Sequence, residues 1–172
     1  MKRSIFSLVA LAPLALACDA GNPAGPADDG RLVNPQFASG GIIHRVSVGS
    51  HDFVPPGVDA NFSLVAIQHA NGRVSGQWSD QFGHGNNGVH VAIDCVHVVG
   101  NRAWLGGVAT DKTFEGLRVI TLVEDNGTSA HETPDQISFT VIDPAQFGIS
   151  PNCNDAAALP LFPLSGGEVK VD

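Results

Sequence analysis

From residue 42 onward the chain is a series of short β-like segments separated by turn residues, and no segment has a convincing helical period over ten residues. Asn71-Gly72 is the strongest short-range signal for a β-hairpin, and Gly100-Asn101 marks a second tight turn. The expected strands are residues 42–48, 62–69, 74–82, 89–99, 103–109, 117–123, 137–142 and 167–171. The sequence therefore predicts an all-β domain of about eight antiparallel strands, folded as a sandwich or as a closed meander barrel.

The first seventeen residues have the features of a secretory leader. Lys2 and Arg3 precede an apolar run over residues 5–17, which is too short for an ordinary membrane span of about 20 residues. Ala15-Leu16-Ala17 followed by Cys18 resembles a bacterial lipobox, and this resemblance implies cleavage before Cys18 and acylation of its thiol. The alternative is an ordinary signal peptide that leaves Cys18 unmodified.

Residues 18–41 are rich in Gly, Pro, Ala, Asp and Asn and show no strand or helix period. We expect the acylated cysteine here to be followed by a flexible tether, and residues 42–172 to form the β domain. Alternatively, Leu32, Val33 and Phe37 dock on that domain.

The net charge of −8 indicates how such a protein attaches to a membrane and which partners it does not bind. An acidic body repels anionic lipid and nucleic acid, so we expect no nucleic-acid partner and attachment to a membrane only through the lipid on Cys18. The expected location is the cell envelope, facing the periplasm or the exterior. Asp19 resembles an inner-membrane retention signal of enteric bacteria, a rule that other lineages do not follow, so the choice of membrane stays open.

Two cysteines remain in the expected domain, Cys95 and Cys153. An even pair in an exported protein predicts a disulfide, whereas two separate buried thiols are the alternative. With both cysteines oxidised, neither can serve as a nucleophile.

Several stretches together resemble one known family. They are residues 91–107 with a V-x-G-N-x-A hairpin, residues 121–127, residues 135–139 and residues 164–171. Their order is similar to the post-COAP repeat domain of secreted bacterial proteins and covers residues 62–172. The resemblance implies a β-rich domain in a bacterial lipoprotein, and it supplies no catalytic residues because the family has no established activity.

Metal ligands are one candidate chemistry, because the chain has seven histidines. A copper–zinc dismutase site needs a His-x-His pair on one strand, and none is present. A looser metal site could use His84, His90 and Asp94, but solvent-facing histidines are the simpler interpretation. Asp125 and Asp135 bracket a loop that could supply oxygens to Ca²⁺, although Asp-Asn-Gly is also ordinary turn chemistry.

A ligand site is the other candidate. Asp80 shares the apolar face of its strand with Trp78, so a buried carboxylate is expected there. Asp80 and Asp94 could form a catalytic pair across a cleft, or Asp80 could be structural. Two tryptophans on hairpin-linked strands are expected in the core, and Trp104, which shares parity with Arg102, is the better surface candidate of the two.

The function most consistent with these features is a non-catalytic envelope module of surface, structural or adhesion type, with an envelope protein or a glycan as its partner and no cofactor. The alternative is a small-ligand-binding lipoprotein that uses a barrel interior or a sandwich cleft, and a metal-dependent enzyme is third. An unfilled cavity with a mouth lined by Trp, Phe and His would favour the ligand binder. A filled core with an exposed face would favour the surface module.

Overall fold

The computed structural model describes residues 41–51, 61–81, 88–127 and 133–172. These residues form ten strands and two short 3₁₀ turns: β1 Ile42–His51, β2 Asn61–His69, β3 Val74–Gln81, β4 Gly88–Val99, β5 Arg102–Ala109, β6 Arg118–Glu124, β7 Gln136–Ser138, β8 Val141–Ile142, η1 Pro144–Phe147, η2 Cys153–Asp155, β9 Leu161–Pro163 and β10 Gly166–Val171. The all-β prediction is confirmed. The count exceeds the expected eight because residues 137–142 divide into β7 and β8, and because β9 was not predicted.

All strand pairs are antiparallel, and the strands from β1 to β7 follow one another as a meander. β10 adds to the free side of β1, and β9 adds to the free side of β7. Only residues 164 and 165 separate β9 from β10 in sequence. The chain therefore passes directly from one edge of the sheet to the other, which brings the two edges together.

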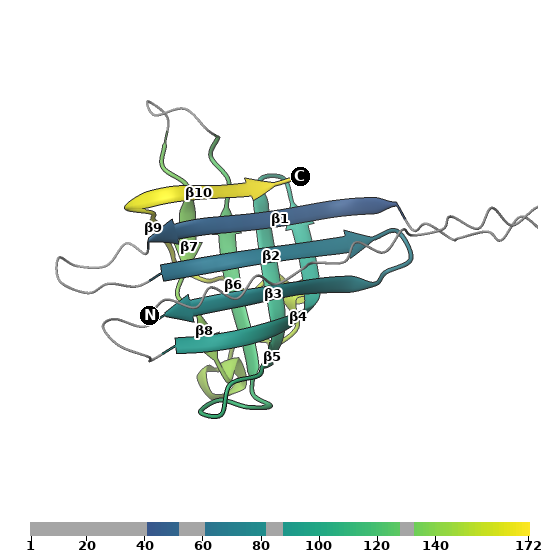
Figure 1. The fold of residues 1–172 in the computed structure, drawn as a ribbon, viewed down its shortest axis with the longest axis vertical. Helices are drawn as coiled ribbons and strands as arrows, with labels where there is room; N and C mark the ends of the chain where they lie inside the picture. Colours follow the sequence, from purple (N-terminus) through teal and green to yellow (C-terminus); the bar gives the residue numbers. More distant parts are fainter. Residues whose placement is uncertain (1–40, 52–60, 82–87, 128–132) are drawn as a thin grey trace, which may run out of the picture. The chain divides into compact units, whose positions relative to one another are not determined.

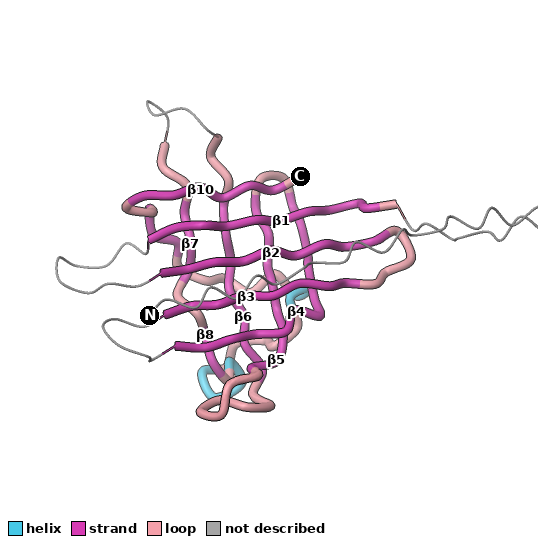
Figure 2. Tube along the Cα trace, in the orientation of Figure 1, coloured by secondary structure: helices cyan, strands magenta, loops and turns pink. Residues whose placement is uncertain are grey.

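The sheet curls into two layers (Figure 1). The first layer contains β10, β1, β2, β3 and the start of β4, whose axes are nearly aligned. The second layer contains β5, β6 and β7, which cross behind the first layer at a steep angle (Figure 2). The long strand β4 belongs to both layers, because its register with β5 shifts between Ile93 and Cys95. A β-bulge of this kind bends a strand and lets it turn a corner between crossed sheets.

The space between the layers is filled by one large core. Phe62 and Trp78 contribute its largest rings, with centroids 5.5 Å apart. The other buried members come from both layers: Val46, Val48, Leu64, Ala66, Val89, Val91, Ile93, Val96, Ala103, Leu105, Ala109, Val119, Val123, Ile137, Leu164 and Val169. Burial of these side chains is the main force that holds the layers together.

A second apolar cluster lies on the opposite face of β5 and β6. Trp104, Ile120 and Leu122 pack there against Leu159 and Cys153. The segment that contains Cys153 and Leu159 covers this face, and we call it the covering segment. The disulfide between Cys95 and Cys153 links the covering segment to β4, which confirms the predicted pairing. β6 is therefore buried on both faces, which explains why its interior does not alternate between apolar and polar residues: Val119, Ile120, Leu122 and Val123 are all buried, and the one polar residue among them, Thr121, is buried and hydrogen-bonded to Ser138.

Two aspartates complete the junction between β10 and the second layer. Asp135 accepts a hydrogen bond from the Val169 N–H at 2.6 Å, and Asp125 accepts one from the Val171 N–H at 3.0 Å. These carboxylates satisfy donors that a neighbouring strand would otherwise take, so they protect the edge of β10 from other pairing.

Candidate binding groove on the outer face of the sheet

The residues singled out from the sequence do not form one site. Trp78 is in the core, as expected, and Asp80 is buried on the same side of β3, where it accepts a hydrogen bond from the Thr140 hydroxyl. This partner favours the structural interpretation of Asp80 over the catalytic one.

Trp104, the better surface candidate of the two tryptophans, is buried like Trp78. Its side chain is only 8% exposed, and its indole Nε1–H donates to the Ala157 carbonyl at 2.9 Å. The parity argument failed because the face that Trp104 shares with Arg102 is covered by the second apolar cluster.

Asp94 also departs from the expected catalytic pair. It lies at the bulge of β4 and points outward, where it forms an ion pair with Arg118 at 2.6 Å. Asp80 is inside the core region and Asp94 is on the surface, so the two carboxylates do not face each other across a cleft.

Two of the three candidate metal ligands lie in the described part of the chain. His84 lies outside the described residues, and His90 and Asp94 are both exposed. In the part of the chain that the structure describes, no group of three His, Cys, Asp or Glu side chains is arranged to hold a metal ion.

The carboxylates considered for Ca²⁺ have structural partners instead. Asp135 accepts hydrogen bonds from the N–H groups of Asn126 and Val169, and Asp125 accepts from Gly127 and Val171. Each of the four carboxylate oxygens is thus engaged by a backbone donor, in keeping with the turn interpretation.

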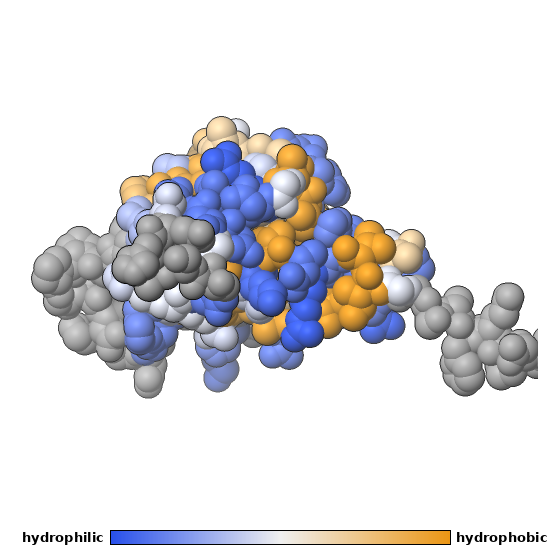
Figure 3. Space-filling view, turned by 90° about the horizontal axis from the view of Figure 1, so that it is seen from above, coloured by the Kyte–Doolittle hydropathy of each residue, from blue (hydrophilic) through white to orange (hydrophobic). Residues whose placement is uncertain are grey.

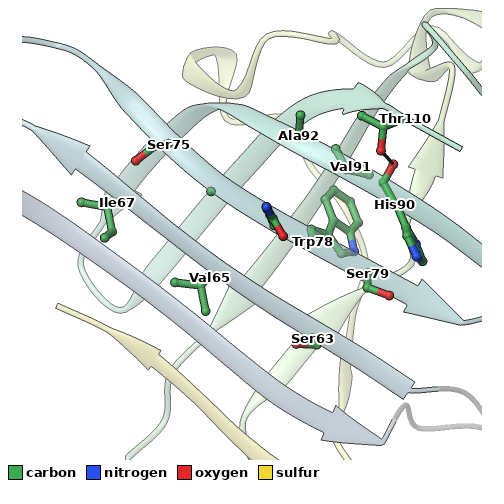
Figure 4. Close-up of a pocket in the computed structure, with 12 residues that line it drawn as sticks. Ser63, Val65, Ile67, Ser75, Trp78, Ser79, His90, Val91, Ala92 and Thr110 are labelled. Atoms are coloured by element: carbon green, nitrogen blue, oxygen red, sulfur yellow. Dashed lines mark hydrogen bonds between the residues drawn. The ribbon is translucent and has the colours of Figure 1, made fainter. Parts of the chain in front are cut away.

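A hollow with a volume of about 920 Å³ lies on the outer face of β2, β3 and β4 (Figure 4). The outward side chains are arranged in three rows across the strands. Their members are Ile67 and Ser75 in the first row, Val65, Gln77 and Ala92 in the second, and Ser63, Ser79 and His90 in the third. Trp78 and Val91 face the other way, into the core.

The hollow follows β3, whose outward residues along it are polar. Ser75 and Ser79 lie on its floor, and Gln77 projects between them from the same face of the strand. Val65 and Ile67 of β2 form an aliphatic wall. The opposite side carries His90, whose carbonyl accepts the Thr110 hydroxyl at 3.2 Å. We call this feature the outer groove.

Gly76 lets β2 and β3 run close together beneath the outer groove. A Cβ at this position would collide with the carbonyl oxygen of Val65 and with the Cα of Ala66. Any larger residue would push the two strands apart, so the shape of the floor depends on this glycine.

A smaller hollow of about 460 Å³ continues the outer groove and shares Ser79 and His90 with it. Asp111 lines this end and accepts the backbone N–H groups of His90, Thr113 and Phe114 at 3.1–3.2 Å. Burial acts to raise the pKa of Asp111, but the hydrogen bonds from these three N–H groups outweigh it and hold the pKa below its ordinary value.

A separate apolar groove of about 610 Å³ lies beside β8 and η1. Phe139 and Phe147 border it and are 57% and 69% exposed, and Phe139 stacks on Phe162 with centroids 4.9 Å apart. Its two hydroxyls already have partners, because Ser138 donates to the Phe139 carbonyl and Thr140 donates to Asp80. We call it the phenylalanine groove.

Apolar surface also occurs elsewhere. On the face seen in Figure 3 it forms strips between polar side chains. Outside both grooves, the large exposed apolar residues include Ile42, Ile43 and Val99. Scattered exposure of this kind is normal and indicates no site by itself.

Neither groove was predicted from the sequence. The outer groove does leave a signal, because the small polar residues Ser75, Gln77 and Ser79 alternate with the inward residues Trp78 and Asp80. The phenylalanine groove leaves none, since its walls come from irregular segments whose packing no period describes.

Searches against protein families, curated proteins and solved structures found no match to this chain. Within the described ranges, no helix has the length and apolar character needed to cross a membrane.

Proposed function

We propose that this protein is a lipid-anchored, non-catalytic binding module of the bacterial cell envelope, of adhesion type, which contacts its partner through the outer groove. One observation carries the choice: the interior between the layers is filled by side chains, whereas a hollow of ligand size lies on the outer face. A filled core argues against a ligand inside the barrel and favours recognition at the surface.

The anchor is proposed from the sequence around Cys18. The leader-like residues 1–17 and the lipobox-like residues before Cys18 support cleavage and acylation, and an acyl group contributes about 0.8 kcal/mol per buried CH₂. Loss of Lys2 and Arg3 with the leader changes the net charge from −8 to −10. Such a body is repelled by anionic lipid, so the lipid would hold the protein while the domain stays free to contact a partner. The post-COAP resemblance is compatible with this role.

The chemistry of the outer groove supports binding rather than catalysis. Acid–base catalysis needs positioned groups that can exchange a proton with a substrate. The carboxylate at the end of the groove, Asp111, already accepts hydrogen bonds from three backbone N–H groups, and the nearby Asp80 faces inward and accepts one from Thr140.

The anchor is tested by the intact mass of the full chain extracted from envelopes with detergent. We expect a chain that begins at Cys18 and carries acyl groups, and we expect the Cys18→Ala variant to leave the membrane fraction. An unmodified Cys18 in the mature protein would contradict the anchor.

The binding face is tested by sedimentation of the detergent-extracted protein with envelope fragments. Ser79→Arg places a long charged side chain on the floor of the outer groove, and Ala145→Arg places the same side chain on the exposed surface of η1. We expect the first variant to lose at least tenfold in bound fraction at limiting protein and the second to bind like the wild type. Equal binding by both variants would contradict the proposal.

A small-ligand-binding protein is the second candidate, and the phenylalanine groove is the observation that favours it. Its volume of about 610 Å³ lies in the range of small-molecule sites, and its described lining has no charged residue. The neutral probe N-phenyl-1-naphthylamine would report occupancy by fluorescence. Phe147→Ser should abolish the signal and Ser79→Arg should preserve it, whereas absence of binding by the wild type would remove this candidate.

A further inference from the structure

The described side chains that line the outer groove include no Asp, Glu, Lys or Arg. Their hydrogen-bonding groups are hydroxyls, one amide and one imidazole, supplied by Ser63, Ser75, Ser79, Thr110, Gln77 and His90. Val65 and Ile67 add an aliphatic wall along the same length. A ligand here would meet many neutral hydrogen-bonding groups on one side and a strip of apolar surface on the other.

Over residues 77–80, the backbone on the floor cannot recognise an extended peptide by strand addition. β3 pairs with β2 over residues 74–80 and with β4 over residues 77–81, whereas the ladder with β4 does not extend to residues 74–76. Peptides that add to a sheet do so at an edge, where N–H and C=O groups are unpaired. Along residues 77–80, recognition in the outer groove must therefore use side chains.

Charge also limits the occupant. The net charge of −8 disfavours a polyanion, because the field of an acidic body repels it. A polycation would need carboxylates along the groove, yet Asp111 lies only at its end and already accepts hydrogen bonds from backbone groups, and the Asp80 carboxylate faces inward and accepts one from Thr140. The middle of the groove is suited to a neutral ligand.

We infer that the outer groove binds a neutral glycan. Ring hydroxyls of a sugar both donate and accept hydrogen bonds, and they match the Ser75, Gln77 and Ser79 side chains on the floor. The C–H faces of the sugar can pack against Val65 and Ile67. Ser75 and Ser79 are four residues apart on an extended strand, so they span about 13 Å, and the groove continues past Ser79 toward Asp111. This length suits a short oligosaccharide segment rather than a single sugar. The inference rests on the proposed function and names the class of its ligand.

The test is a titration of the detergent-extracted, ¹⁵N-labelled protein with neutral hexaoses of the malto, cello and chito series, and with a hexauronate of similar length. We expect at least one neutral hexaose to shift the amide resonances of residues 63–67, 75–79 and 90–92, and the hexauronate to leave them unchanged.

Two substitutions in the outer groove test whether the sugar contacts its floor. Ser79→Arg should weaken the affinity for the active hexaose at least tenfold, and Gln77→Ala should weaken it about threefold or more. Ala145→Arg is the matched control and should retain wild-type affinity. The amide spectrum of each variant in the absence of sugar shows whether it is folded. If Ser79→Arg does not fold, Gln77→Ala still tests the contact, because it shortens a side chain at an exposed position.

The inference is overturned if none of the three neutral hexaoses shifts these resonances at millimolar concentration, if only the hexauronate does, or if the shifts lie only around Phe139 and Phe147. If envelope fragments still bind through the groove in these cases, the proposed function stands and only the glycan assignment falls. If envelope binding also survives Ser79→Arg, the proposed function falls with it.

Discussion

Asp135 holds three segments of the chain together. Its carboxylate accepts the N–H groups of Asn126 and Val169, and its backbone carbonyl accepts the N–H of Leu164 at 2.8 Å. The side chain is buried, so these donors have little access to water if the carboxylate is removed. A buried donor left without a partner costs about 1–3 kcal/mol.

We therefore predict that Asp135→Ala lowers the free energy of unfolding by about 2–4 kcal/mol. Asp125→Ala should cost less, because Asp125 is more exposed and water can replace it. Urea denaturation of the two variants and the wild type measures the difference. An equal or larger effect at Asp125 would show that these carboxylates do not close the junction with β10 as described.

Asp111 gives a pH dependence whose sign follows from its pKa. Burial acts to raise that pKa, but hydrogen bonds from His90, Phe114 and Thr113 outweigh it, so the folded-state pKa is lower than the unfolded value of about 3.9. The carboxylate therefore stabilises the fold above about pH 3.9, and this stabilisation is lost as the pH falls further, through the folded-state pKa.

The prediction is that the wild type loses stability more steeply than Asp111→Asn when the pH is lowered from 5 to 2. Thermal unfolding followed by circular dichroism across this range gives the comparison. Parallel curves for the two proteins would mean that the hydrogen bonds to Asp111 do not stabilise its ionised form.

At the scale of the elements, the disulfide fixes a covering segment onto the second layer. Cys95 and Cys153 are 58 residues apart, and closing a loop of this length stabilises a fold by about 4 kcal/mol in the chain-entropy treatment. Because Cys153 belongs to the cluster on the outer face of β5 and β6, reduction should loosen that face first.

We predict that the double variant Cys95→Ala/Cys153→Ala loses about 2–4 kcal/mol of unfolding free energy. Amide hydrogen exchange should show the largest gain in rate at residues 149–161 and little change in β1 and β2. A uniform gain over the whole domain would contradict local attachment by the disulfide.

Trp104 tests whether the covering segment buries β5. Its packing and its hydrogen bond to the Ala157 carbonyl predict a loss of about 3–5 kcal/mol for Trp104→Ala, the range for a buried tryptophan. A surface tryptophan would give a loss close to zero. Chemical denaturation monitored by circular dichroism separates the two outcomes.

The elements that depend on local signals could be predicted from the sequence. The hairpin at Asn71-Gly72 and the strands on either side of it were expected within a residue or so of where they lie. β4 could be predicted as a strand, but the bend that takes it from one layer to the other could not. Its inward residues alternate up to Ile93, and the extra residue at the bulge makes Val96 the next buried position. Such a bulge depends on the tertiary fold more than on local preference.

At the scale of the whole molecule, sequence reasoning identified the core but not the surfaces. Trp78 and its apolar neighbours could be assigned to the interior because one layer alternates regularly. The burial of Trp104 depends on a segment more than 40 residues away in sequence, which the disulfide attaches to Cys95 of β4. The outer groove likewise exists only after β2, β3 and β4 have paired in register, so no single segment contains it.

The central claim is that the tethered domain meets its partner with the outer groove, and hydroxyl-radical footprinting of the protein on envelope fragments tests it most directly. Val65 in the outer groove is 44% exposed, and Phe139 and Phe147 in the phenylalanine groove are exposed as well, so both surfaces react when the protein is free in detergent. We predict that binding lowers oxidation of Val65 and His90 at least threefold and leaves the two phenylalanines unchanged. Protection of Phe139 and Phe147 with no change at Val65 and His90 would contradict the account.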